Sequence, residues 1–387
     1  MTRKICVLTG TRAEFGIMHR LIAAIDAEDR FELQLIATGM HLSSEFGYTY
    51  KEIESKGLHI DKKIEILLSS DTPVAISKSM GIAQMSFASA FEELQPDLLL
   101  VLGDRFEVFA AAAAAMIARI PVAHLHGGEA TEGLIDEPIR HSVTKMSHLH
   151  FTATETYRKR VIQLGEQPEN VYNVGSLGVE NIQYIRSLSK EELEQQLGFT
   201  FKARNLLVTF HPVTLEHNTA SAQFSALLNS LSKLSDTQLI FTKANSDTEG
   251  RVINDMIDRF VDTHEQAYAT FSLGQERYFN CLKYVDAAVG NSSSGLIEAP
   301  SFNIGTINIG DRQRGRVQAD TVINCDANEA SIDSALKTLY SADHQAALKT
   351  LQNPYEQANV CQRILDIIAD VPDLAALIKK RFYNIAF

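Results

Sequence analysis

The sequence predicts an α/β protein made of two Rossmann-like halves, each with a doubly wound parallel sheet. Three observations predict this fold class. The chain has 387 residues, which is too long for one ordinary hydrophobic core. Short runs of leucine, isoleucine and valine alternate with longer segments of helical period. The alternation is interrupted by a polar, charge-rich segment, RSLSKEELEQQLG, and then starts again.

In the first half, five short apolar runs are expected to be buried parallel strands: KICVLTG, ELQLIATG, LLLVLGD, VAHLHGG and LHFTAT. The segments between them are expected to be helices: FGIMHRLIAAIDA, PVAISKSMGIAQMSFASAFEEL, RFEVFAAAAAAMIAR and PIRHSVTKMS. The pattern continues to about Gly178, so the first domain is predicted over residues 1–178.

The second half repeats the pattern with the strand candidates NLLVTFHP, QLIFTKA, AYATFSLG, YVDAAVGN and IGTINIG. This predicts a second Rossmann-like domain over residues 179–365. Two more helix candidates follow, EQANVCQRILDIIAD and DLAALIKKRFY. Tails of this kind in two-Rossmann enzymes often return to the first domain, and residues 366–387 are a candidate for such a C-terminal helix.

Composition excludes several classes of function. A formal net charge of −12, with no evident basic face, argues against binding to nucleic acid or to anionic membranes. The longest apolar stretches, such as DLLLVLG and FAAAAAAMIA, are too short to span a bilayer, and MTRKICVLTG does not read as a signal peptide. Four scattered cysteines are expected to be buried free thiols, which favours the cytoplasm.

Polar motifs follow most of the predicted strands. TGTRAE and TGMH follow the first two, GDRFE and HLHGGE follow later ones, and HPVT, KANSD and GNSSSG follow strands of the second half. Parallel sheets bind ligands at the carboxyl ends of their strands. We therefore expect the active site at these ends, in one cleft between the two domains.

GNSSSG indicates an anion site. A glycine–serine turn that leads into a helix exposes backbone N–H groups at the positive end of the helix dipole, and Ser292, Ser293 and Ser294 add hydroxyl donors. The alternative is an ordinary helix N-cap, for which one serine suffices. Glu298, one turn later, is placed to bind a ribose diol; the alternative is a solvated helix residue.

GTRAEFG has neither GxGxxG spacing nor the lysine of a P-loop, so it supports neither dinucleotide nor ATP binding. Arg12 in this motif can neutralise a diphosphate, although a surface ion pair with Glu14 competes with that interpretation. Arg312, in GDRQRGR, is a second cationic candidate.

Titratable residues gather at the other strand ends, as expected of acid–base machinery. They are Asp104, Arg105, His124, His126, Glu129, Asp136, His141 and His211. Helix capping explains single residues of this kind but not so many. A metal site is the rival interpretation, but no HExxH or similar spacing is present, and we expect no metal.

Together these motifs resemble the UDP-N-acetylglucosamine 2-epimerases, and within them the hydrolysing branch that begins sialic-acid synthesis. The resemblance runs from Gly10 to Arg316 and rests on GTRAEFG, TGMH, GDRFE, HLHGGE, IDEPIRHSVTKMSHLH, VGSLG, HPVT, GNSSSGLIEAP and NIGDRQRGR. It implies the GT-B architecture, with the active site between two Rossmann domains and UDP held mainly by the second.

The resemblance also implies the site residues. Asp104 and Asp136 match positions that the family uses for proton transfer, and His126 or Glu129 completes this catalytic set. His211 also lines the site. Candidates for binding the UDP-sugar are Arg12, His41, Arg105, Asn245, Ser292, Ser293, Ser294, Glu298 and Arg312.

One position departs from the family pattern. Many hydrolysing relatives have glutamate where this chain has His126, so either Glu129 takes the carboxylate role or His126 transfers the proton. The HGGE form also occurs in the sialic-acid branch and is compatible with a modified sugar.

The implied reaction converts UDP-N-acetylglucosamine to N-acetylmannosamine and UDP through a 2-acetamidoglycal, without a cofactor, in a homo-oligomer. Four alternatives stay open. They are the same reaction on UDP-2,4-diacetamido-2,4,6-trideoxyglucose, a non-hydrolysing 2-epimerase, a GT-B glycosyltransferase, and a nucleotide-sugar-binding protein without catalysis. Release of the free 2-epimer without an acceptor sugar distinguishes the hydrolysing reaction, on either sugar, from the non-hydrolysing epimerase, the glycosyltransferase and the binding protein.

Overall fold

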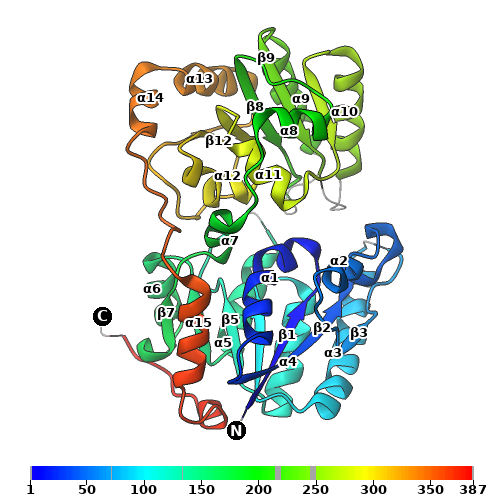
Figure 1. Ribbon diagram of the computed structural model, residues 1–387, viewed down its shortest axis with the longest axis vertical. Coiled ribbons are helices and arrows are strands. Elements are labelled where there is room, and N and C mark those ends of the chain that lie inside the picture. Colours follow the sequence, from blue (N-terminus) through cyan, green and yellow to red (C-terminus); the bar gives the residue numbers. More distant parts are fainter. Residues whose placement is uncertain (1, 71, 133, 214–218, 245–249, 386–387) are drawn as a thin grey trace. The chain divides into compact units, whose positions relative to one another are not determined.

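The computed structural model describes residues 2–70, 72–132, 134–213, 219–244 and 250–385. The chain forms two compact units (Figure 1). Unit 1 comprises Met1–Glu129, Asp136–Asn181 and Gln357–Phe387, and unit 2 comprises Ala130–Ile135 and Ile182–Glu356. The limits of domains that would fold independently stay a prediction, because compactness alone does not establish autonomous folding.

Unit 1 contains a seven-stranded parallel sheet in the order β3-β2-β1-β4-β5-β6-β7. The strands are β1 (Arg3–Thr9), β2 (Phe31–Thr38), β3 (Lys62–Ile64), β4 (Leu98–Leu102), β5 (Val122–Leu125), β6 (Leu149–Thr152) and β7 (Val171–Asn173). The strand order reverses between β1 and β4, which is the switch point where such sheets bind ligands. All five predicted strands are confirmed; β3 and β7 have three residues each, too few to show a period.

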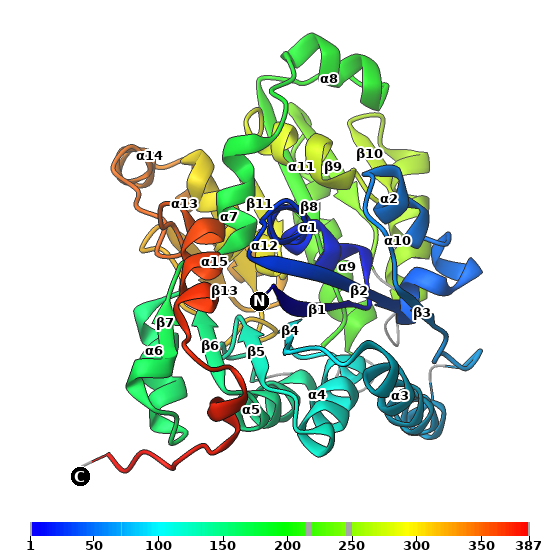
Figure 2. The same ribbon diagram turned by 60° about the horizontal axis from the view of Figure 1, so that its bottom comes forward.

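Helices cover both faces of this sheet because its strands alternate their side chains between two cores. They are α1 (Arg12–Asp26), α2 (Tyr50–Ser55), α3 (Pro73–Leu94), α4 (Phe106–Ala118), α5 (Asp136–Met146), α6 (Glu155–Gln163), α7 (Leu177–Asn181) and α15 (Val360–Asp370). Ile5 and Val7 of β1 pack with α1 and α15, whereas Cys6 and Leu8 pack with α3 and α4. Figure 2 shows these two helical layers on opposite sides of the strands.

The C-terminal tail belongs to unit 1, where α15 packs against α1 and α7. The prediction of a further helix in DLAALIKKRFY, and of a C-terminal helix over 366–387, is wrong. α15 ends at Asp370, and only a short 3-10 turn, Ala375–Ile378, follows. Past this turn the tail is tied to α5 and the residue after it, because Lys380 Nζ donates to the carbonyls of Lys145 and Ser147, 2.6 and 2.7 Å away.

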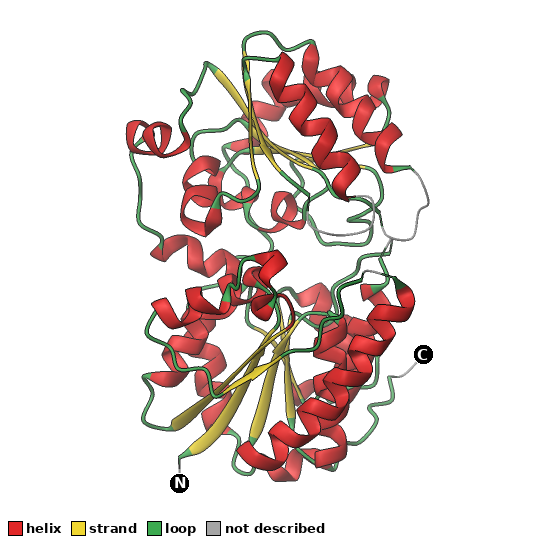
Figure 3. Ribbon diagram, turned by 90° about the vertical axis from the view of Figure 1, so that its right-hand side faces the viewer, coloured by secondary structure: helices red, strands yellow, loops and turns green. Residues whose placement is uncertain are grey.

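Unit 2 contains a six-stranded parallel sheet in the order β10-β9-β8-β11-β12-β13. The strands are β8 (Arg204–Thr209), β9 (Thr237–Thr242), β10 (Ala267–Thr270), β11 (Ala287–Gly290), β12 (Gly305–Ile309) and β13 (Val322–Cys325). The helices are α8 (Lys190–Leu197), α9 (Ala220–Ser232), α10 (Gly250–Thr263), α11 (Gly274–Leu282), α12 (Ser293–Ile297), α13 (Glu329–Leu339) and α14 (Ala342–Leu348). Figure 3 shows the helices of each unit around its strands. The prediction of two doubly wound parallel sheets is confirmed.

All four cysteines are free thiols, as predicted. Cys6, Cys281 and Cys361 are buried, whereas Cys325 is only half-buried. Within the part of the chain that the structure describes, no helix is both long enough and apolar enough to cross a membrane.

Helix α3 carries an exposed glycine, Gly81, near its middle. A Cβ atom at this position would have no neighbour within 4 Å. We expect Gly81→Ala to raise the free energy of unfolding by about 0.5–1 kcal/mol, because alanine loses less backbone entropy in a helix. Thermal unfolding monitored by circular dichroism checks this, and a lower Tm than that of the wild type would contradict it.

Candidate active site

The serine-rich loop connects β11 to α12 in unit 2. Ser292 is the N-cap of α12, and its hydroxyl accepts a hydrogen bond from the Ser294 backbone N–H at 3.4 Å. Tyr278 Oη donates to Ser294 Oγ at 2.7 Å. The alternative interpretation, an ordinary N-cap, is therefore present for Ser292, and Ser293 is the half-buried first residue of α12. The anion site stays a prediction.

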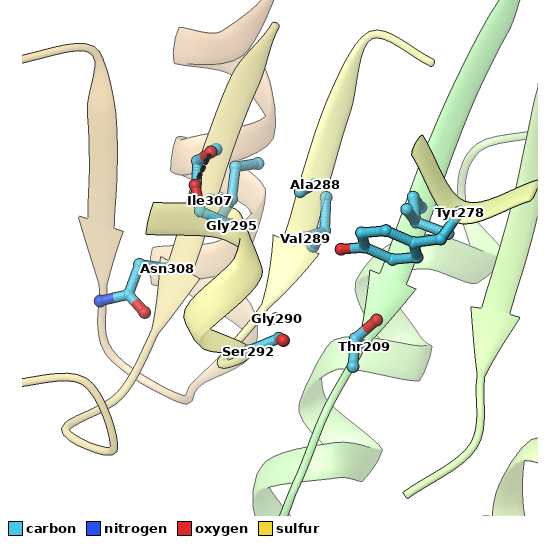
Figure 4. A pocket seen from close by; sticks show the side chains of 11 residues that line it. Thr209, Tyr278, Ala288, Val289, Gly290, Ser292, Gly295, Ile307 and Asn308 are labelled. Atoms are coloured by element: carbon cyan, nitrogen blue, oxygen red, sulfur yellow. Dashed lines mark hydrogen bonds between the residues drawn. The ribbon is translucent and has the colours of Figure 1, made fainter. Parts of the chain in front are cut away.

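A small pocket lies beside this loop (Figure 4). Leu207, Thr209, Tyr278, Ala288, Val289, Gly290, Ser292, Gly295, Thr306, Ile307 and Asn308 line it. Burial raises the pKa of Tyr278, so its hydroxyl stays protonated and acts as a donor at neutral pH. The pocket thus combines apolar walls with a few polar groups at the end of β11.

Gly290 ends β11 in a backbone conformation that suits only glycine. Its φ is +131°, and a Cβ atom there would lie 1.9 Å from the carbonyl oxygen of Thr209. The turn into the serine loop therefore depends on close contact between the backbones of β11 and β8.

Asn291 connects three parts of this site. Its amide exchanges two 2.7 Å hydrogen bonds with the backbone of His211, and its own carbonyl accepts from Arg312 Nη1 at 3.2 Å and from Gln313 Nε2 at 2.9 Å. His211 and Arg312, both predicted site residues, are thus held at one point of unit 2. Burial, together with the charge of Arg312, lowers the pKa of His211 to about 3, so this imidazole is neutral at pH 7.

Glu298 and Asn245 are two further residues predicted to bind UDP. Glu298 is half-buried at the C-cap of α12, one turn beyond the serines. Asn245 lies outside the described residues.

In unit 1, Arg140 contacts two of the acid–base candidates, Asp104 and Glu129. It is buried to 1% exposure on α5 and forms an ion pair with Asp104, which follows β4. Arg140 Nη1 also contacts Glu137 at 2.6 Å and donates to the carbonyl of Glu129 at 3.0 Å. Because a buried guanidinium needs partners on all sides, it fixes Asp104 beside the turn that carries Glu129.

His126 and Glu129 form a hydrogen-bonded pair in the HGGE turn. His126 Nδ1 lies 3.1 Å from Glu129 Oε1, and Glu129 is 4% exposed. The backbone of His126 has a φ of +63°, which is unusual for a residue other than glycine. Its other nitrogen, Nε2, is buried and has no hydrogen-bond partner among the residues that the structure describes. The pair therefore leaves one imidazole nitrogen unengaged.

Arg105 and Asp136 lie on the same side of unit 1. Arg105 is the N-cap residue of α4, and Asp136 is the first residue of α5. Glu107 Oε1 accepts from Arg105 Nε at 2.8 Å. Glu107, and then Glu14 and Asp136, raise the pKa of Arg105 through their electrostatic interaction with its guanidinium.

Two predicted ligand-binding residues, Arg12 and His41, have local partners in unit 1. Arg12 pairs with Glu52 at 3.2 Å and not with Glu14, whose carboxylate turns inward to the backbone of Gly10 and Thr11. His41 is fully buried, with one ring nitrogen 3.0 Å from Thr9 Oγ1 and the other 2.8 Å from Thr49 Oγ1. Their predicted contacts with a ligand stay predictions.

His124 and His141 also have local partners. His124 is buried between the carbonyl of Gly103 and the hydroxyl of Thr144. Burial lowers the pKa of its imidazole to about 3. His141 lies 3.1 Å from Glu137. His124 is therefore a neutral core residue at pH 7.

Glu14 gives a prediction on pH dependence. Burial, and then the charge of Glu107, raise its pKa to about 8, whereas the unfolded chain releases this proton near 4.5. The folded protein binds the extra proton between these values, so its stability falls as the pH rises through this window. We expect Glu14→Gln to remove up to about 1.4 kcal/mol of this loss per pH unit between pH 5 and pH 8. Urea unfolding of both proteins at several pH values tests this; equal slopes would contradict it.

No group of three or more histidine, cysteine, aspartate or glutamate side chains is arranged to hold a metal ion in the described ranges 2–70, 72–132, 134–213, 219–244 and 250–385.

The sequence reading missed three residues that organise these sites: Arg140, Glu107 and Asn291. Arg140 stands four residues after Asp136 on a helix, a spacing that places two side chains on one face. Glu107 and Asn291 lie within the quoted motifs GDRFE and GNSSSG, so their position in these motifs was the signal that could have identified them.

Comparison with known proteins gives a family match. The model of the family described as UDP-N-acetylglucosamine 2-epimerase matches residues 23–369. The chain is 43% identical over 342 residues to the GDP/UDP-N,N'-diacetylbacillosamine 2-epimerase (hydrolyzing) of Campylobacter jejuni, covering 88% of each chain. It is 39% identical to the polysialic acid biosynthesis protein P7 of Escherichia coli, over 99% of this chain and 98% of that protein.

Among solved structures, the UDP-GlcNAc 2-epimerase of Neisseria meningitidis bound to UDP-GlcNAc is similar to this chain, with a TM-score of 0.81. The match covers 94% of this chain and 99% of that one, at 17% identity. At this identity the likeness shows the fold, which is the predicted GT-B type.

Proposed function

The chain belongs to the UDP-N-acetylglucosamine 2-epimerase family, with the hydrolysing UDP-sugar 2-epimerases, and on this basis we propose the reaction that it catalyses. It releases UDP from a UDP-2-acetamido sugar and inverts the sugar at C2. The observation that carries this proposal is a cluster in unit 1. The buried guanidinium of Arg140 pairs with Asp104 and donates to the backbone carbonyl of Glu129. Such a cluster supplies charged and neutral proton-transfer groups at fixed positions.

In the proposed binding step, unit 2 holds UDP. The serines 292–294 at the start of α12 and the Arg312 guanidinium supply donors for the diphosphate, and Glu298 accepts from the ribose hydroxyls. His211, neutral at pH 7, adds a hydrogen-bonding group without a charge. This arrangement supplies the local positive field that an acidic protein needs to bind an anionic substrate.

In the first chemical step, Asp104 accepts the proton from C2 of the sugar while the C1–O bond breaks. Its ion pair with the buried Arg140 guanidinium holds the carboxylate in one position just after the end of β4. The electrons of the C2–H bond form the C1–C2 double bond, and UDP leaves with the electron pair of the broken C1–O bond. The product of this step is a 2-acetamidoglycal.

In the second step, the oxygen of water adds to C1 and this water gives up one proton to the solvent, while a different proton, from a protein group, reaches C2 from the opposite face. We assign this proton to His126, with Asp136 as the second candidate. Glu129 accepts from His126 Nδ1 and stabilises the charged imidazolium, as a carboxylate does in other hydrogen-bonded acid–base pairs. The histidine–glutamate pair thereby replaces the single glutamate that many relatives have at this position.

Two sugars fit this chemistry. The name of the Campylobacter jejuni relative supports N,N'-diacetylbacillosamine, which is 2,4-diacetamido-2,4,6-trideoxyglucose. A relative from Legionella pneumophila, 34% identical over 98% of this chain, has a name that supports the same sugar. N-acetylglucosamine, converted to N-acetylmannosamine for sialic acid, is the second candidate, supported by the Escherichia coli protein for polysialic acid synthesis. We place the diacetamido sugar first because two relatives support it.

Incubation with each UDP-sugar in heavy water, followed by NMR, tests the proposal. We expect UDP and a free 2-epimer that carries deuterium at C2, with a higher kcat/KM for the diacetamido substrate. Intact UDP-linked 2-epimer would indicate the non-hydrolysing reaction instead. Absence of sugar release from both substrates would contradict the proposal.

We also propose that the protein acts in the cytoplasm, because its four cysteines are free thiols. The homo-oligomer stays a prediction, which light scattering after size-exclusion chromatography tests.

A further inference from the structure

Glu107 is a buried carboxylate that the proposed mechanism does not use. It is 1% exposed in the first turn of α4, and its Oε1 accepts a hydrogen bond from Arg105 Nε at 2.8 Å. Its other oxygen, Oε2, is buried without a hydrogen-bond partner among the described residues. A buried carboxylate that is only half satisfied costs stability, so its presence needs an explanation.

The backbone around Glu107 leaves room for it. A Cβ atom on Gly10 would lie 2.4 Å from Glu107 Oε1, and one on Gly39 would lie 3.5 Å from the same oxygen. Two glycines, one after β1 and one after β2, therefore border the space that this carboxylate fills. The contact with Glu107 explains why the first residue of GTRAEFG, Gly10, is a glycine.

Arg105 differs from Glu107 in its access to solvent. Its side chain is 37% exposed, whereas that of Glu107 is 1% exposed. The bond to Glu107 uses Nε, and one terminal nitrogen lies 4.0 Å from Met40 Sδ. An arginine fixed through Nε keeps its terminal N–H donors for a second anion, with less loss of side-chain entropy on binding.

We propose that Glu107 is a positioning residue for Arg105: it fixes the guanidinium at the start of α4 so that its terminal N–H groups bind the UDP-sugar. This inference rests on the proposed function and adds a residue to it. The N-terminal N–H groups of the 13-residue α4 adjoin Arg105 and favour an anion at the same place.

The charge of Glu14 fits this role. Its carboxyl accepts from the N–H groups of Gly10 and Thr11 at 2.8 and 3.2 Å, and its raised pKa keeps it protonated at pH 7. Of the two buried carboxyls beside Arg105, only Glu107 then carries a charge at pH 7, and the half-buried Asp136 is a further acidic neighbour. The neutral Glu14 thus takes less of the positive charge of Arg105 away from an anionic substrate.

A double-mutant cycle tests the inference with Glu107→Gln, Arg105→Ala and the double variant, assayed with the UDP-sugar that the wild type turns over. We expect Glu107→Gln to raise KM about tenfold or more, with kcat within about threefold, because a bound arginine holds substrate and transition state alike. In the Arg105→Ala background, Glu107→Gln should change KM less than about twofold.

Two further variants keep the result interpretable. Glu14→Gln removes a neighbouring carboxyl that is neutral at pH 7, and KM should stay within about twofold of the wild type. Glu107→Asp keeps the charge but shortens the side chain, and it should raise KM even if Glu107→Gln does not fold. Independent, multiplying effects in the cycle would overturn the inference, as would an unchanged KM in Glu107→Asp. Failure of the wild type on both UDP-sugars would instead overturn the proposed function.

Discussion

Asp104→Asn is expected to lower kcat about a hundredfold or more while the affinity for UDP changes little. Asparagine keeps the shape of the side chain but cannot accept the C2 proton, and general acid–base groups typically contribute 10²–10⁴ in rate. Steady-state release of UDP and titration calorimetry with UDP measure the two quantities separately. Turnover near the wild-type rate would remove Asp104 from proton transfer.

The ion pair with Arg140 requires a matched control for this variant. Glu137 is a second carboxylate that contacts Arg140, at 2.6 Å, and it is not among the proposed catalytic residues. If Asp104 acted only by holding Arg140 in place, Glu137→Gln would lower kcat to a similar extent. We expect Glu137→Gln to lower kcat less than about tenfold, with a comparable fall in Tm for both variants because each removes one carboxylate from Arg140.

Gly290→Ala is expected to give the largest loss of stability of any single change considered. The added Cβ would lie 1.9 Å from a backbone oxygen of β8, and the φ of +131° is strained for alanine. Strain and overpacking together cost about 2–6 kcal/mol. Urea unfolding of the variant measures this loss.

The position of Gly290 also affects binding. Any shift that relieves the contact moves the serine loop, so UDP affinity should fall together with stability. Gly310→Ala is the matched control, because Gly310 also has a positive φ, +71°, but a Cβ there would approach only the Ala327 side chain at 3.8 Å. It should cost about 1–2 kcal/mol and leave UDP affinity unchanged. Equal effects of both substitutions would mean that the contact with β8 is not important.

Most of the fold could be predicted because its strands are buried on both faces. Such strands appear as continuous apolar runs, and all ten predicted runs contain strands. The three further strands have three or four residues, and β13 lies at the edge of its sheet with polar and half-buried residues. Short edge strands leave little periodic signal.

The candidate site could be predicted only as residue types at strand ends. That reasoning found Asp104, His126 and Glu129, which the structure brings together through Arg140. It could not find that His41 has both ring nitrogens engaged by threonines, because Thr9 stands 32 residues before it and Thr49 eight residues after it, outside the motif TGMH. It also could not separate Arg12 from Glu14, because the partner of Arg12 lies 40 residues further along, at Glu52. Side-chain partners depend on tertiary contacts that a local pattern does not contain.

The assignment of residues 357–387 to unit 1 has a consequence for synthesis on the ribosome. Unit 2 is complete once residue 356 has been made, whereas the apolar surface of α1 and α7 waits for α15, near the end of the chain. The part of the protein that is translated first is therefore the last to be finished. During that interval its uncovered hydrophobic side chains are a target for chaperones and a risk for aggregation.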